Sequence, residues 1–175
     1  MASPEEVNTK ELMDYYGYKG ILGEIRLKLK LLRCFVLQFL ASFSPSPSLA
    51  VLFHRAKGCK IGNHVYIGPG VHIDILYPKL VTIEDYVSIG MNSMIFAHSN
   101  PTNSIWVKQH HYPRKVAPVT IKKGSWIPPG VTILCGVTIG ENAVIGAHSL
   151  VTRDAPPYTV CAGLPAKEVA KLQKK

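Results

Sequence analysis

Paired cysteines are absent from the sequence. Its four cysteines, Cys34, Cys59, Cys135 and Cys161, include no C-x-x-C pair, which argues against a zinc knuckle or a redox pair. We therefore expect no metal site, and unpaired cysteines favour a cytoplasmic setting. Charged residues are also scarce, at 18%, whereas 47% of the residues are hydrophobic, so the chain is too apolar for disorder. The 175 residues suit one domain with an appendage.

We expect no leader peptide in this sequence, and a long hydrophobic run is missing from it too. Residues 1–19 are largely polar and acidic, so no secretion signal is expected there. The most apolar stretch, Cys34–Phe43, is ten residues long and contains Gln38 and Ser42. Because a spanning helix needs about twenty apolar residues, this stretch is not expected to cross a membrane.

Acidic residues are few, at 11 against 20 Lys and Arg, which gives a net charge of +9. The excess lies after residue 50, where fourteen basic residues face six acidic ones. These cations scatter along the chain and accompany no known nucleic-acid motif, so we expect anionic small ligands and no nucleic-acid partner.

An amphipathic helix is predicted before residue 44. Its apolar residues recur every three or four positions: Leu22, Ile25, Leu29, Leu32, Val36, Phe39 and Phe43. Arg26, Lys30 and Arg33 lie on another face. Two interpretations remain open: packing against its own domain or a sister subunit, which we favour, and weak contact with an anionic membrane surface. The Pro-rich run 44–48 ends this helix.

A six-residue repeat dominates the rest of the chain. Its aliphatic anchors are Ile61, Ile67, Ile73, Ile83, Ile89, Ile95, Ile121, Ile127, Ile133, Ile139, Ile145 and Val151. A small or β-branched residue follows most anchors by four positions, and glycine often follows by one. An α-helix, with a period of about 3.6, cannot hold a period of six through twelve units.

The six-residue step predicts a triangular parallel β-helix. Each hexad contributes one short strand with its aliphatic side chain inward, and three hexads close one coil, so twelve hexads give about four coils. The predicted fold is therefore all-β, with an N-terminal α-helical extension. We expect a helical segment at 1–50, the β-helix at 51–170 and a basic tail at 171–175.

The hexads resemble those of the hexapeptide-repeat acyltransferases, whose β-helix is left-handed. The stretch GVTIGENAVIGAHSLVTRDAPPYTVCAGLPAKEV is similar to the C-terminal signature of the maltose, galactoside and nodulation-type sugar O-acetyltransferases. The resemblance covers roughly residues 51–170. It implies transfer of an acetyl group from acetyl-coenzyme A to a sugar or saccharide hydroxyl. It also implies a homotrimer with active sites between neighbouring subunits.

Two interruptions of the repeat mark where function is expected. Four extra residues lie between Ile73 and Ile83, and twenty lie between Ile95 and Ile121. His98 stands at the root of the longer insertion. Acyl transfer to a hydroxyl needs a base of near-neutral pKa, which histidine supplies. His98 also resembles the family histidine at the start of the extended loop, and the implied role is general base.

Two residues are candidates for binding the acceptor. Asp74 lies in the hexad of Ile73. The hexad of Ile95 occupies the same side of the prism one coil later, so Asp74 is expected close to His98. There it could orient a sugar hydroxyl or the imidazole. The asparagine that assists the histidine in galactoside-type enzymes has no clear counterpart, and Asn92 is a substitute without further support.

Coenzyme contacts are assigned by resemblance alone. Trp126 and Pro129 look like residues along the pantetheine arm, and Ala147 and Thr152 look like backbone contacts. Arg153 and Lys167 look like the cations near the phosphates. Pro128 departs from the family pattern, because it replaces a glycine and removes a backbone donor.

Two alternative functions remain open. The γ-class carbonic anhydrases share the implied fold but need three histidines on one metal, and their pair spaced by five is missing, since Asn103 lies five residues after His98. A noncatalytic trimeric scaffold is the other alternative.

Overall fold

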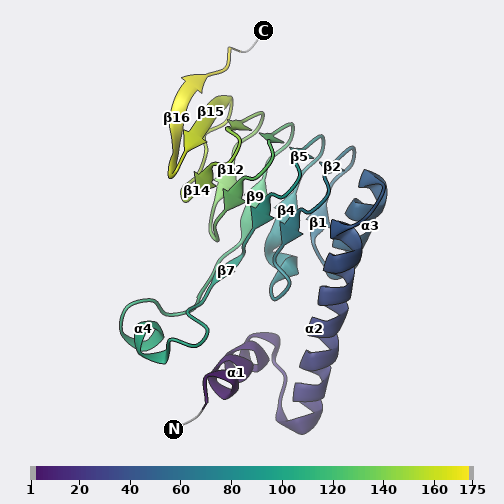
Figure 1. Cartoon of the computed structure of the whole chain (residues 1–175), viewed down its shortest axis with the longest axis vertical. Coiled ribbons are helices and arrows are strands. Elements are labelled where there is room, and N and C mark those ends of the chain that lie inside the picture. Colours follow the sequence, from purple (N-terminus) through teal and green to yellow (C-terminus); the bar gives the residue numbers. More distant parts are fainter. Residues whose placement is uncertain (1–2, 174–175) are drawn as a thin grey trace.

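The computed structural model, which describes residues 3–173, shows helices at the N-terminus, a β-helix and a C-terminal hairpin (Figure 1). Three helices precede the strands: α1 (Pro4–Tyr16), α2 (Gly20–Ser42) and α3 (Pro47–Lys57). A short 3₁₀ turn lies at Pro78–Leu80, and α4 (Ile105–His110) lies in the long insertion.

The β-helix strands are two or three residues long, and one strand of each coil joins each of three parallel sheets. The first sheet contains β1 (Lys60–Ile61), β4 (Val81–Ile83), β9 (Val119–Ile121) and β12 (Thr138–Ile139). The second contains β2 (Tyr66–Ile67), β5 (Ser88–Ile89), β10 (Trp126–Ile127), β13 (Val144–Ile145), β15 (Thr159–Gly163) and β16 (Ala166–Lys171), which turns back antiparallel to β15. The third contains β3 (His72–Ile73), β6 (Met94–Ile95), β11 (Thr132–Ile133) and β14 (Leu150–Val151).

The predicted stack of aliphatic anchors is confirmed. Ile61 pairs with Ile83, Ile83 with Ile121 and Ile121 with Ile139, so one column runs through all four coils. The anchors from Ile67 to Val151 are buried and form the core of the prism. The six-residue step therefore produces a parallel β-helix, as expected.

The helical part is larger than predicted, so the chain is not simply all-β. The Pro-rich run ends α2, but Pro47 then begins α3, at a first-turn position where a missing N–H costs nothing. Because α3 reaches Lys57, the β-helix begins at Lys60 and not at residue 51. At the other end, β16 reaches Lys171, and residues 174–175 of the predicted basic tail lie outside the described residues.

The predicted apolar stripe does not pack on its own domain. The buried residues of α2 are instead Gly23, Leu27, Cys34, Gln38 and Ala41. The predicted stripe is exposed throughout: Leu22, Ile25, Leu29, Leu32, Val36, Phe39 and Phe43. No helix within residues 3–173 has the length and hydropathy to cross a bilayer.

The inner face of α2 covers the open edge of the first coil. Among the described strands, β3 is the last of the third sheet and pairs only with β6, so alternate backbone groups on its outer side need other partners. Gln38 supplies them, because its Nε2 donates to the carbonyl oxygen of Val71 at 2.9 Å and its Oε1 accepts the N–H of Ile73 at 3.2 Å. Lys57 Nζ donates to Ile73 O at 2.6 Å and to Gln38 Oε1. Arg55 similarly donates to Ile61 O and Gly62 O beside β1.

We predict that Gln38→Leu lowers the free energy of unfolding by about 2–4 kcal/mol, because two buried backbone groups and the Lys57 ammonium lose a partner. Urea unfolding followed by circular dichroism measures the change. Gln109→Leu is the matched control, because Gln109 is exposed and should change stability by less than about 0.5 kcal/mol. Equal effects of the two substitutions would contradict the edge-capping role.

Candidate active site

The long insertion leaves the β-helix as a two-stranded ribbon. Strands β7 (His98–Ser99) and β8 (Lys115–Val116) run antiparallel, and His98 pairs with Val116. Between them the chain carries α4, and Figure 1 shows this loop projecting away from the prism. His98 is therefore fixed by strand pairing at the root of the loop, as predicted.

His98 and Asp74 form a close pair. Nδ1 of His98 lies 2.5 Å from Oδ2 of Asp74, whose side chain is fully buried. The carboxylate also accepts the backbone N–H groups of Leu76 at 2.9 Å, Tyr77 at 3.0 Å and Ala97 at 2.8 Å. Burial alone would raise the pKa of Asp74, but these hydrogen bonds and the charge of His98 outweigh it and lower the pKa.

This pair fixes the imidazole for base chemistry. An ionised carboxylate only accepts hydrogen bonds, so Nδ1 of His98 carries a proton, and in the neutral form of the imidazole Nε2 keeps its lone pair. The ring of Tyr77 lies 5.3 Å from the imidazole, between centroids, and limits its movement. The arrangement has the base and orienting group that proton abstraction from a hydroxyl requires. The predicted proximity of Asp74 and His98 is confirmed.

Asp74 does not fit direct contact with an acceptor. Its side chain has no exposed surface, and both oxygens are occupied by His98 and backbone N–H groups. Of the two roles expected from the sequence, only orientation of the imidazole is compatible with this position.

A small cavity of about 150 Å³ adjoins the base. Its lining residues are His98, Ser99, Lys115, Leu134, Cys135 and Thr152. Thr152, which resembles a coenzyme contact, thus shares a cavity with the base although 54 residues separate them in the chain. The cavity is too small for a drug-sized ligand, since such sites usually enclose about 300 Å³ or more.

A second cavity has a volume of about 280 Å³, and the residues on both sides of Thr152 in the chain help to line it. Arg153 and Lys167 both line it, so the two cations assigned by resemblance do come together. Asp154 and Glu168 also line the cavity, but Oδ1 of Asp154 is held by the backbone N–H of Thr138 at 2.7 Å. Arg153 and Lys167 are exposed and available to an anionic ligand.

The remaining candidates lie elsewhere on the prism. Pro129 and Ala147 occupy stacked turns between the second and third sheets, where His148 N–H donates to Pro129 O at 3.1 Å. Asn92 occupies the turn of the coil before, in a left-handed conformation with φ 56°. Trp126 lies on the second sheet, with 54% of its surface exposed. Within one chain, these four residues are therefore not brought to His98, which follows the third sheet.

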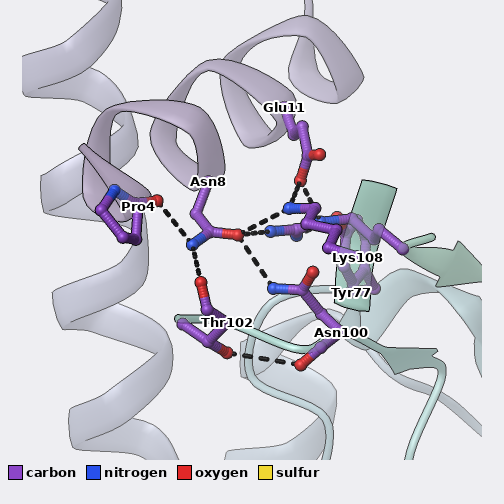
Figure 2. A network of polar contacts seen from close by, with 8 residues as sticks. Pro4, Asn8, Glu11, Tyr77, Asn100, Thr102 and Lys108 are labelled. Carbon is purple, nitrogen blue, oxygen red and sulfur yellow. Dashed lines mark hydrogen bonds and ion pairs between the residues drawn. The ribbon is translucent and has the colours of Figure 1, made fainter. Parts of the chain in front are cut away.

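Helix α1 holds the long loop in place (Figure 2). Asn8 Nδ2 donates to Thr102 O at 2.8 Å, and its Oδ1 accepts from Asn100 Nδ2 at 2.9 Å and from Lys108 Nζ at 2.9 Å. Glu11 Oε2 lies 2.6 Å from Lys108 Nζ and 2.6 Å from Arg114 Nε. The loop that begins at His98 is thus tied to the N-terminal helix.

The same network reaches the base through Tyr77. Nη1 of Arg114 donates to the Tyr77 hydroxyl at 2.9 Å, and the Tyr77 ring packs beside His98. Sequence reasoning missed Tyr77, Asn8 and Glu11. The four-residue insertion after Ile73 was a usable signal for Tyr77, which lies within it. No sequence signal connects α1 to residues a hundred positions later.

Comparison with known proteins places the chain among acetyltransferases. A family model described as bacterial transferase hexapeptide (six repeats) matches residues 118–153. The galactoside O-acetyltransferase of Escherichia coli is 37% identical over 127 residues, which are 70% of this chain and 58% of that protein. A putative colanic acid biosynthesis acetyltransferase of Escherichia coli is 32% identical and matches over 64% of this chain and 69% of its own length.

A solved structure of a galactoside acetyltransferase in complex with coenzyme A has the same fold. It is 28% identical, with a TM-score of 0.66, over 84% of this chain and 82% of that chain. The matched region covers 58%, 61% and 44% of the full length of three curated relatives. The chain therefore spans only about half of the length of these proteins.

We predict that Glu11→Ala loosens the long loop. Lys108 and Arg114 are largely buried, with 6% and 9% of their side chains exposed, so losing their carboxylate costs more than about 1.4 kcal/mol. Amide hydrogen exchange in residues 100–114 should become roughly tenfold faster or more, while exchange in the three sheets stays unchanged.

Glu5→Ala is the matched control for this change, because Glu5 lies on the same helix and is exposed. It should leave exchange in the loop as in the unmodified chain. Equal exchange rates in the Glu11→Ala and Glu5→Ala variants would show that α1 does not hold the loop.

Proposed function

Because the chain belongs to the hexapeptide-repeat acetyltransferase family, we propose that it transfers an acetyl group from acetyl-coenzyme A to a hydroxyl of a sugar or saccharide. The observation that carries this proposal is the His98–Asp74 pair, at 2.5 Å, beside the cavity that Thr152 also lines. A fixed imidazole with one free nitrogen is the group that hydroxyl acylation needs.

In the proposed reaction, the acceptor hydroxyl attacks the thioester carbonyl while Nε2 of His98 takes its proton. The carbon–sulfur bond breaks, and the imidazolium returns the proton to the coenzyme sulfur. Asp74 stays ionised throughout, because its hydrogen bonds stabilise the carboxylate, and it balances the charge that His98 gains. Asp74 is therefore a positioning residue, and His98 is the catalytic residue.

The coenzyme is expected to run from the cavity at His98 toward Arg153 and Lys167. Thr152 lies at the thioester end, and the two cations would bind phosphates by charge-assisted hydrogen bonds. The acetyl group would then lie next to Nε2.

A trimer would complete this site. Trp126, Pro129 and Ala147 lie at a different part of the prism from His98, so they cannot border the same groove within one chain. A neighbouring left-handed β-helix could bring them, together with Asn92, opposite His98. The small size of the cavity in one chain supports a site between two subunits.

We predict that His98→Ala lowers kcat for acetyl transfer by on the order of 10²–10⁴-fold and leaves coenzyme affinity nearly unchanged. Steady-state kinetics with acetyl-coenzyme A and a panel of sugars, nucleotide sugars and lipid-linked saccharides measures the first quantity, and calorimetric titration of coenzyme A measures the second. Activity within a few-fold of the unmodified enzyme would reject the general-base role.

Asp74→Asn tests the orienting role separately. The amide nitrogen would take the place of Oδ2, so it would donate to Nδ1 and leave the proton on Nε2. We expect kcat to fall at least tenfold with KM little changed, and the free energy of unfolding shows whether the fold is kept. If stability falls but kcat does not fall at least tenfold at a nearly unchanged KM, Asp74 has only a structural role.

We predict that replacing both Arg153 and Lys167 by alanine weakens coenzyme A binding, most strongly at low salt. Calorimetric titration at two ionic strengths checks this. The matched control replaces Lys60 and Lys79, which are exposed cations near the other end of the β-helix, and should leave affinity unchanged. Unchanged affinity in the Arg153/Lys167 variant would remove both residues from the site.

A further inference from the structure

The outer face of α2 is an apolar surface that no part of the described chain, residues 3–173, covers. We call it the apolar stripe, and it consists of Ile21, Leu22, Ile25, Leu29, Leu32, Val36, Phe39, Leu40 and Phe43. Each of these side chains is at least 42% exposed, and Ile21, Leu22 and Phe43 exceed 70%. An exposed apolar surface of this extent marks an interaction site.

The position of the stripe limits what can cover it. The opposite face of α2 rests on the open edge of the first coil through Gln38, so the stripe points away from the β-helix. Figure 1 shows α2 beside α3 at the end of the prism where β1 and β2 lie. Subunits that associate through the sides of the prism would therefore leave the stripe uncovered.

Cations border the stripe on both edges. Arg26 lies four residues after Leu22 and three before Leu29, so it adjoins both on the helix surface. Arg33 has the same relation to Leu29 and Val36, although one nitrogen of its guanidinium donates to Ala56 O at 2.6 Å. Lys28 adjoins Ile25 and Leu32 on the other edge. Glu24 is the sole carboxylate of α2, and it pairs with Lys28 at 2.7 Å.

We propose that α2 docks the protein onto an anionic phospholipid surface, with the apolar stripe inserted between the headgroups and the bordering cations on the lipid phosphates. A helix with Leu and Phe on one face and Arg and Lys at its edges has the composition of interfacial helices. The helix lies in the plane of the interface, because it lacks the hydropathy needed to span the bilayer.

A second copy of the chain is a poorer occupant. A two-fold contact places the same surface on both partners, so the cations of one stripe would face those of the other. With Glu24 as the one acidic residue of α2, such a contact lacks compensating charge. Anionic headgroups supply that charge without any change in the protein.

Vesicle flotation of the full-length chain tests the proposal. The protein should float with vesicles that contain phosphatidylglycerol and remain unbound with pure phosphatidylcholine. Raising the salt concentration should weaken the binding, because the contacts with lipid phosphates are screened. Absence of flotation, or equal flotation with both lipids, would overturn the proposal.

Two variants assign the binding to the stripe and its cations. Leu32→Gln combined with Phe39→Gln should abolish flotation, whereas Val169→Gln, at an exposed apolar residue on the C-terminal hairpin, should not. Arg26→Gln should weaken binding roughly fivefold, which is the contribution of one basic residue near an anionic surface. Lys171→Gln is its matched control on β16, and it should have no effect.

Sedimentation of the same proteins without vesicles separates a lipid surface from a second copy. Leu32→Gln/Phe39→Gln should leave the oligomeric state and the thermal unfolding temperature unchanged, since both side chains are more than half exposed. An assembly that forms in the unmodified chain and dissociates in this variant would show that the stripe is a protein interface. That result would overturn the proposal whether or not the chain is an acetyltransferase.

Discussion

Backbone pairing between successive coils is the constraint on which the structure depends. Each two-residue strand has too few hydrogen bonds to persist alone, and it is held only because an equivalent strand lies above or below it in register. Every hexad must therefore keep the step of its neighbours. The fold can be altered at two places: at a turn, where an insertion can leave the prism, and at an end, where an edge must be covered.

The candidate active site follows from the first of these places. Because Ile73 pairs with Ile95, the residues after these two anchors lie one above the other. Asp74 and His98 are thereby brought to 2.5 Å although 24 positions separate them. The short insertion contributes Tyr77 and the long insertion begins at His98, so both departures from the repeat meet at one turn. The rigid coils fix the base, and the long loop above it is held by α1.

The sequence predicts what the repeat determines, and little beyond it. The anchors from Ile61 to Val151 define coils and registers, and hence the proximity of Asp74 and His98, because a fixed period converts position in the chain into position in space. Contacts of Asn8 and Glu11 with the loop have no period and could not be predicted. Helix α1 itself left a signal, since Ser3 and Glu6 form a capping box, but its docking site depends on tertiary packing.

Helix α2 shows most clearly why the spacing of apolar residues does not determine which face of a helix contacts the rest of the protein. Its three- and four-residue spacing correctly predicts an amphipathic helix, and the expected result is that the bulky apolar face turns toward the domain. The opposite occurs, because the open edge of a β-sheet requires hydrogen bonds more than apolar contact. Gln38, which is buried on the inner face of α2, supplies the missing partners of that edge. Leu27 is buried on the same inner face as Gln38, but most of the other bulky apolar residues of the helix are left facing outward.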